Sequence, residues 1–171
     1  MTELSIPPTA TVPVGDYRTL MAGFPTGVAV VTTMADGEPR GMTCSSLCSV
    51  TLTPPTLLVC LRSASQTLAA VLGCGGFAVN LLDEHAAPIA QLFASGAPDK
   101  FDRVNWRLDR AWGGPRLPVA AHAAANCHVV RTDLVSDHVV VFGEVDDLWW
   151  GRHGDPLLYG RRRYAAWPGG E

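Results

Sequence analysis

The chain consists mostly of short apolar runs that are separated by turn signals, and this pattern is typical of β-strands. Strands are expected at residues 28–34, 41–50, 56–61, 77–82, 124–135, 138–149 and 157–164. Helical spacing is rarer. It predicts helices over residues 17–22 and 63–72 and from Asp83 to about Ala94, with Asp16 and Asp83 as caps and Gly73 as a stop. Strands therefore outnumber helices, and short turns such as residues 35–38 join most neighbours.

The order of these elements narrows the fold class. Strands and helices do not alternate regularly, which argues against a doubly wound parallel sheet. A closed antiparallel barrel with a few peripheral helices fits better. The length of 171 residues is that of one domain. We therefore expect a flexible N-terminal arm over residues 1–14, a single domain over residues 15–167 and a tail over residues 168–171.

The predicted strand at residues 41–50 carries small polar side chains where a buried strand normally has Val, Ile or Leu. Hydroxyls and a thiol occupy the positions from Thr43 to Ser46, and another hydroxyl follows at Ser49. Small side chains leave room, and their polar atoms offer hydrogen bonds. The segment therefore suits a strand against which a flat ligand with a polar edge lies.

A second candidate site lies where a predicted strand gives way to a helix. Arg62, Ser63, Ser65 and Thr67 bring a guanidinium and three hydroxyls to this helix start. Exposed N–H groups and the helix dipole favour an anion there, and arginine adds charge-assisted hydrogen bonds. We predict a phosphate site; the alternative is that Ser63 or Ser65 only caps the helix.

Two further motifs carry less weight. Residues 73–78 match G-x-G-x-x-A, but this loop closes a helix and opens a strand, the reverse of a dinucleotide-binding fingerprint. His138 begins a strand after a Ser-Asp turn, and taken alone it reads as a turn histidine hydrogen-bonded to Asp137. The sequence has no G-x-S-x-G motif, so a hydrolase triad has no support.

Charge and composition exclude several classes of function. The formal net charge is -3, and 12 of the 13 basic residues are arginines with no extended basic face, so no nucleic-acid partner is expected. No run approaches the roughly 18 apolar residues of a membrane span, and no signal peptide is apparent. We expect a cytoplasmic protein without a membrane partner. The five cysteines are expected to be small buried hydrophobes, with no disulfide and no metal site.

Taken together, these stretches resemble the flavin reductase-like family, the short-chain reductases that supply reduced flavin to two-component monooxygenases. The resemblance covers about Asp16 to Tyr164 and rests on the order and spacing of short pieces. These pieces are residues 24–28, 41–43, 45–46, 49, 54–55, 63–67, 77–82, 100–101, 137–138, 143–145, 156–159 and 163–164. The resemblance implies a mainly β fold with peripheral helices, an antiparallel FMN-binding split barrel of Greek-key type.

The resemblance also implies roles for individual residues. Residues expected near the flavin ring and ribityl chain are Pro25, Thr26, Gly27, Thr43, Cys44, Ser45, Ser46, Ser49, Cys60 and Leu61. Those expected to hold its phosphate are Arg62, Ser63, Ser65 and Thr67. Asn80, Phe93, Lys100 and Phe101 would lie near the flavin or come from a partner subunit, and Arg163 and Tyr164 would close the substrate side. His138 would face the nicotinamide as an orienting group, on a turn where Ser136 replaces a common Gly.

The resulting hypothesis is an NAD(P)H-dependent flavin reductase. Its cofactors would be FMN or FAD together with NADH or NADPH. Its partners would be a second copy in a homodimer and a flavin-dependent monooxygenase that receives reduced flavin. Two alternatives stay open: a flavin-binding electron carrier without a nicotinamide site, and a split-barrel flavoenzyme that uses tightly bound FMN to oxidise an organic substrate directly.

Overall fold

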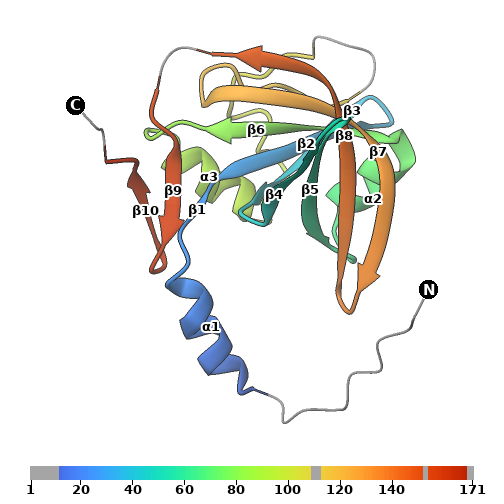
Figure 1. The fold of residues 1–171 in the computed structure, drawn as a ribbon. Helices are drawn as coiled ribbons and strands as arrows, with labels where there is room; N and C mark the ends of the chain where they lie inside the picture. Colours follow the sequence, from blue (N-terminus) through green and yellow to red (C-terminus); the bar gives the residue numbers. More distant parts are fainter. Residues whose placement is uncertain (1–11, 109–112, 152–153, 169–171) are drawn as a thin grey trace, which may run out of the picture.

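The protein is a curled antiparallel sheet with helices around it, as the computed structural model shows for residues 12–108, 113–151 and 154–168 (Figure 1). Seven strands are hydrogen-bonded in the order β3-β2-β6-β7-β8-β5-β4. Their bounds are β2 Ala29–Ala35, β3 Glu38–Cys44, β4 Leu47–Leu52, β5 Pro55–Arg62, β6 Gly76–Leu82, β7 Ala121–Val135 and β8 His138–Trp150. A smaller antiparallel sheet has the order β1-β9-β10, with β1 Thr26–Gly27, β9 Leu157–Gly160 and β10 Arg163–Ala166.

The short connection between its two edge strands determines the shape of the large sheet. β3 and β4 follow one another in sequence, yet they stand at opposite ends of the strand order. Only Ser45 and Ser46 join them, and the three steps from Cys44 to Leu47 span at most about 11 Å. The sheet must therefore curl until its two edges approach each other without pairing. This arrangement confirms the prediction of a mainly β, antiparallel split barrel.

Two predicted strands are each two strands in the structure. Residues 41–50 change partner within the run, because Cys44 pairs with Ala29 on β2 whereas Leu47 pairs with Val59 on β5. Residues 157–164 fold back on themselves as β9 and β10, with Arg161 and Arg162 at the turn. Neither break carries a strong turn signal such as Pro, Asn-Gly or Asp-Gly, so the local pattern did not show it.

The helix ends also differ from the predictions. Helix α2 (Gln66–Cys74) begins after Ser65, whose side-chain oxygen accepts a hydrogen bond from the Leu68 N–H. It continues through Gly73 and ends at Gly75, which has a φ of 73° and therefore adopts the left-handed conformation that favours glycine. Helix α3 (Ala87–Ala94) begins later than predicted, because the Asp83 carboxylate accepts from the His85 N–H and forms a turn before the helix.

Two apolar clusters hold the barrel together. One lies inside the curled sheet under α2 and includes Val31, Leu61, Phe77 and Val141, all fully buried. The other lies under α3 on the outer face of β2 and includes Phe93 and Phe101, whose rings meet edge to face with centroids 5.0 Å apart. We call the large sheet with α2 and α3, which these two clusters hold together, the frame of the protein.

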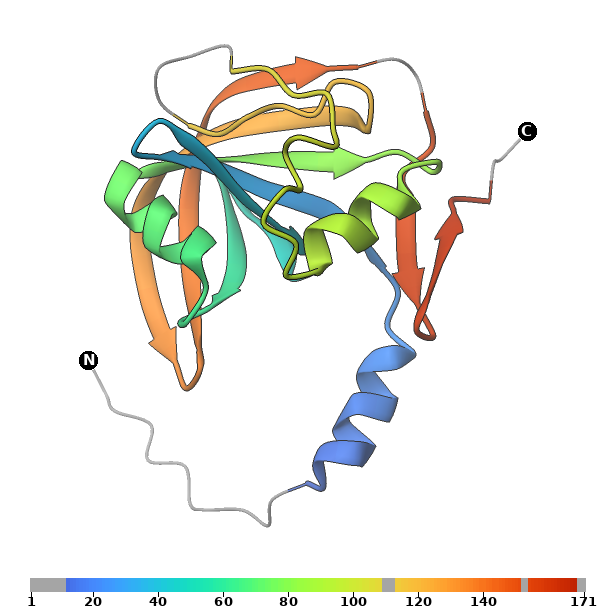
Figure 2. The same ribbon diagram turned by 180° about the vertical axis from the view of Figure 1, so that it is seen from behind.

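Helix α1 (Val14–Ala22) stands apart from this frame (Figures 1 and 2) and has no buried residue. The expected N-terminal arm lies outside the described residues up to position 11, and Val14 already belongs to α1. The expected tail lies outside them from position 169 onward. Within the described part of the chain, none of the helices has the length and apolar character needed to cross a membrane.

Candidate functional site

A cleft of about 810 Å³ lies between α1, the β3–β4 connection and the β9–β10 hairpin. Its walls combine aromatic and aliphatic side chains with hydroxyls, thiols and two arginines. They are formed by Tyr17, Arg18, Met21, Ala22, Phe24, Thr26, Ser45, Ser46, Leu47, Cys48, Leu58, Cys60, Tyr159, Gly160 and Arg162. The volume lies in the usual range of small-molecule sites, roughly 300–1,000 Å³.

The floor of the cleft is the break between β3 and β4. The Ser46 hydroxyl donates to the Cys60 carbonyl at 3.1 Å, and the Cys60 N–H donates to the Ser46 carbonyl at 3.2 Å. The Cys44 thiol lies 3.4 Å from the Ser46 hydroxyl, and its burial raises the pKa of the thiol. Ser45 and Ser46 belong to neither strand and are exposed. The predicted small polar residues thus present hydroxyls and backbone at a fixed place in the cleft.

The opposite wall is the β9–β10 hairpin, which β1 joins to the N-terminal segment. Thr26 pairs with Tyr159, and the rings of Tyr159 and Tyr164 lie 5.1 Å apart. Partial burial and the nearby Tyr159 raise the pKa of Tyr164. A side chain at Gly160 would place its Cβ 3.1 Å from the Cβ of Pro25. The predicted segment at residues 25–27 is therefore brought to the cleft, with Thr26 lining it.

The two other predicted features, the phosphate site and the histidine turn, lie side by side. Arg62 on β5 pairs with His138 on β8. The backbone N–H and the hydroxyl of Ser63 both donate to the Asp137 carbonyl, at 2.9 and 3.0 Å. Nδ1 of His138 lies 2.8 Å from Oδ1 of Asp137, and this hydrogen bond with the charge of His138 lowers the pKa of Asp137. Asp137 therefore stays ionised at neutral pH and holds the imidazole.

Several residues that were predicted to lie near the flavin have side chains that are buried in the protein and do not line the cleft. Asn80 is fully buried and has only protein partners: its amide nitrogen donates to the Val30 and Pro115 carbonyls and the Thr32 hydroxyl, and its oxygen accepts from the Leu117 N–H. Side chains that belong to the apolar core or to the buried face of α2 are Cys44, Leu61, Thr67, Phe93 and Phe101. None of these side chains lines the cleft.

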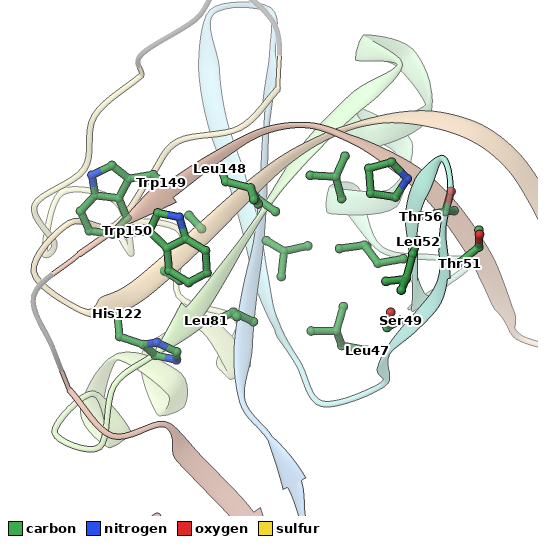
Figure 3. A pocket seen from close by; sticks show the side chains of 17 residues that line it. Leu47, Ser49, Thr51, Leu52, Thr56, Leu81, His122, Leu148, Trp149 and Trp150 are labelled. Carbon is green, nitrogen blue, oxygen red and sulfur yellow. The ribbon is translucent and has the colours of Figure 1, made fainter.

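Three more predicted residues do not line the cleft. The Thr43 hydroxyl donates to the Ala90 carbonyl at 2.6 Å and ties β3 to α3. Lys100 donates to the carbonyls of Gly41 and Ser95, and partial burial lowers its pKa. Ser49 lines a second, apolar pocket of about 280 Å³ between β4 and the ends of β7 and β8, beside Leu47, Thr51 and Leu52 (Figure 3). Each hydroxyl or ammonium group serves the frame or another surface.

The sequence interpretation missed most of the α1 wall and part of the hairpin. The missed lining residues are Tyr17, Arg18, Met21, Ala22, Phe24, Leu47, Cys48, Leu58, Tyr159, Gly160 and Arg162. One signal was present: Val14, Tyr17, Met21 and Phe24 follow the spacing of an apolar helix stripe, although nothing in the described chain buries them. Arg163, predicted to close the substrate side, is exposed on β10 next to this wall.

Comparisons with known proteins identify the family of the chain. The family described as "Flavin reductase like domain" matches residues 21–168. The flavin reductase (NADPH) of Lentzea aerocolonigenes is 49% identical over 94% of each chain. The reductase subunit HsaB of a flavin-dependent monooxygenase from Rhodococcus jostii is 36% identical and covers 88% of this chain and 76% of that protein.

A solved structure gives the same result for the fold. The NADH:FAD oxidoreductase SgcE6 of Streptomyces globisporus, in complex with NAD and FAD fragments, superimposes with a TM-score of 0.85 at 31% identity. The match covers 95% of this chain and all of that one. Both the sequence and the fold comparisons therefore extend over nearly the whole chain, and the protein belongs to the flavin reductase-like family.

Proposed function

We propose that this protein binds FMN or FAD in the cleft, transfers a hydride to it from NADPH or NADH, and releases the reduced flavin to a partner monooxygenase. The enzyme class, an NAD(P)H:flavin oxidoreductase, follows from the family match and from the 49% identical relative. The single observation that carries the residue-level proposal is the cleft itself, whose floor is the strand break at Ser45 and Ser46.

The residues of the cleft fit a flavin. The apolar side chains of Met21, Leu58 and Tyr159 offer surface to a flat ring, and the exposed hydroxyls of Ser45 and Ser46 offer hydrogen bonds at its edge. No acidic residue is among those that line the cleft. This combination of apolar walls and a few convergent polar groups is what a cofactor site requires.

A bound flavin supplies the electron acceptor, since its ring takes a hydride from the reduced nicotinamide. The protein's part is to position the ring and to stabilise the negative charge that the ring gains. The Ser45 hydroxyl and the backbone N–H groups at the strand break are suited to this, because the two hydrogen bonds between Ser46 and Cys60 hold the segment in place. The aromatic side chains of Tyr17 and Tyr159 line the other side of the cleft.

The flavin phosphate is proposed to lie at the start of α2, held by Arg62 and Ser65. Ser65 accepts the capping hydrogen bond from Leu68, which leaves its hydroxyl proton to donate to a ligand. Ser63 is assigned a different role, because its hydroxyl already donates to the Asp137 carbonyl. Ser63 therefore positions the turn that carries His138, and Thr67 is excluded by its burial.

The partner monooxygenase is proposed because HsaB, a relative over most of this chain, is the reductase subunit of such an enzyme.

A cytoplasmic location is also proposed; it is supported by the five cysteines, all of which are free thiols in the structure. Localisation of the tagged full chain to the membrane or to the cell exterior would contradict this placement.

The first test of the function is oxidation of NADH and NADPH by the purified chain with FMN, FAD or riboflavin. A flavin reductase oxidises at least one nicotinamide only when flavin is added, and the rate rises with the flavin concentration. An electron carrier gives no such oxidation. A flavoenzyme with a resident cofactor keeps its yellow colour through dialysis and does not respond to added flavin.

A homodimer is proposed because α1 exposes an apolar surface that the monomer does not cover. A nine-residue helix without buried residues is marginal in water unless something packs against it. Leu20 on this helix is 69% exposed and does not line the cleft.

We expect light scattering to give twice the chain mass of 18.2 kDa, and Leu20→Asp to shift the mass toward the monomer. Val119→Asp, at an equally exposed loop position, is the control; a monomeric wild type would refute the proposal.

The phosphate assignment predicts a difference between two flavins. Arg62→Gln should weaken FMN binding about tenfold, because a charge-assisted hydrogen bond is lost, while riboflavin binding changes less than about twofold. Fluorescence quenching gives both dissociation constants, and Arg103→Gln, an exposed arginine outside the cleft, is the matched control. Equal weakening of FMN and riboflavin would show that Arg62 does not hold the phosphate.

The role assigned to His138 predicts a separation of turnover from flavin binding. His138→Ala should lower turnover about tenfold, because the nicotinamide loses an orienting contact and misplacement of reacting groups is costly. The flavin dissociation constant should stay within about twofold, since His138 is not among the lining residues of the cleft. Stopped-flow reduction and flavin titration measure the two effects, with His85→Ala at an exposed site as control. Unchanged reduction kinetics would rule out this role.

A further inference from the structure

The turn between β9 and β10 holds two arginines in an unfavourable backbone conformation. Arg161 has a φ of 49° and Arg162 a φ of 61°, both in the left-handed region. Two-residue hairpin turns of this kind favour Asn-Gly or Asp-Gly, because residues with a larger side chain are strained there. Strained positions of this kind gather at ligand sites, where the structure around them holds the side chain in a useful place.

This turn is hydrogen-bonded to the end of α1, and it contributes a positively charged residue to the lining of the cleft. The Arg161 N–H donates to the Ala22 carbonyl at 2.6 Å, which joins the turn to the end of α1. Arg162 lines the cleft, and Arg18 lines it from α1. Two elements that are far apart in the sequence thus each contribute one arginine to the lining of the cleft.

The positive charge at the cleft is not balanced by an acidic partner in the described part of the chain. Arg18 and Arg162 are the two charged residues among those that line the cleft. Within the described ranges, neither arginine has an ion pair or a side-chain hydrogen bond, whereas the exposed Arg131 pairs with Asp133. The chain as a whole carries a net charge of -3, so this is a local concentration of positive charge. An unpaired guanidinium pair beside a nucleotide cleft is suited to a phosphate group.

We propose that Arg162, assisted by Arg18, binds the 2′-phosphate of NADPH and makes the enzyme discriminate between NADPH and NADH. The inference rests on the proposed function. The proposed function assigns the flavin phosphate to Arg62 at the end of β5 and to Ser65 at the start of α2. Arg18 on α1 and Arg162 in the hairpin turn are therefore available to bind a second anion. Both arginines are exposed, as expected for residues that hold the outer end of a dinucleotide.

Three phosphate groups could bind these arginines: the 2′-phosphate of NADPH, the diphosphate of the dinucleotide and the diphosphate of FAD. Simple probes distinguish them. 2′,5′-ADP carries the 2′-phosphate without the nicotinamide, ADP-ribose carries the diphosphate without the 2′-phosphate, and 5′-AMP carries neither. Calorimetry with each probe reads binding independently of turnover. The wild type should bind 2′,5′-ADP at least about tenfold more tightly than 5′-AMP, the gain expected from charge-assisted hydrogen bonds.

The decisive variant is Arg162→Asn, because asparagine removes the charge and tolerates the left-handed conformation of the turn. It should raise the KM for NADPH and the dissociation constant for 2′,5′-ADP about tenfold, and change the NADH, ADP-ribose and FAD values less than about twofold. Arg162→Lys should restore part of the preference, and Arg18→Gln should lower it less. Arg103→Gln, outside the cleft, should leave every value unchanged.

Each outcome decides the inference. Equal losses for NADPH and NADH, an equal loss for ADP-ribose, or a loss for FAD alone would overturn it, and so would a wild type that does not bind 2′,5′-ADP. These results differ from a failure of the proposed function, in which the wild type oxidises neither nicotinamide with any flavin. Circular dichroism of Arg162→Asn confirms that the variant is folded before the constants are compared.

Discussion

The two-residue connection between β3 and β4 is the constraint on which the rest of the structure depends. These strands are the two edges of a seven-stranded sheet, and the short link forces the edges together without letting them pair. A sheet closed in this way has an interior for apolar side chains, filled here by residues such as Val31 and Phe77. It also has a break between β3 and β4, where the hydroxyls and backbone of Ser45 and Ser46 are outside the regular strand pairing. The core and the cleft are therefore two consequences of the same connection.

The period of two along β4 and β5 then divides the side chains between surfaces. Ser46, Cys48, Leu58 and Cys60 share the face that lines the cleft, whereas Ser49 and its partner Leu57 line the apolar pocket on the other face. Alternation does not decide every position, because Ser45 and Leu47 line the cleft although they have the parity of Ser49. The reciprocal hydrogen bonds between Ser46 and Cys60 fix the register that makes this division.

The sequence predicted elements with a local signature and missed those that depend on distant partners. The long strands β7 and β8 and the antiparallel class followed from hydrophobic alternation and turns. The break at Ser45 did not, because it arises from a change of partner from β2 to β5 and not from a change of residue type. The family resemblance placed Asn80 near the flavin or at a partner subunit. Its partners include the backbone at Pro115 and Leu117, 35 and 37 residues away, and a local pattern does not reveal them.

The cleft lies between a well-packed frame and elements that have little packing of their own, and this asymmetry suits an enzyme that must release its flavin. The floor is hydrogen-bonded through Ser46 to β5, whose Val59 and Leu61 are fully buried, while the α1 wall has no buried residue. Segments with few buried contacts open at low free-energy cost, whereas core strands open only with global unfolding. A ligand held between the two is oriented by the rigid side and leaves through the other. The strained arginine turn, tied to α1 through Ala22, places charge on the side that opens.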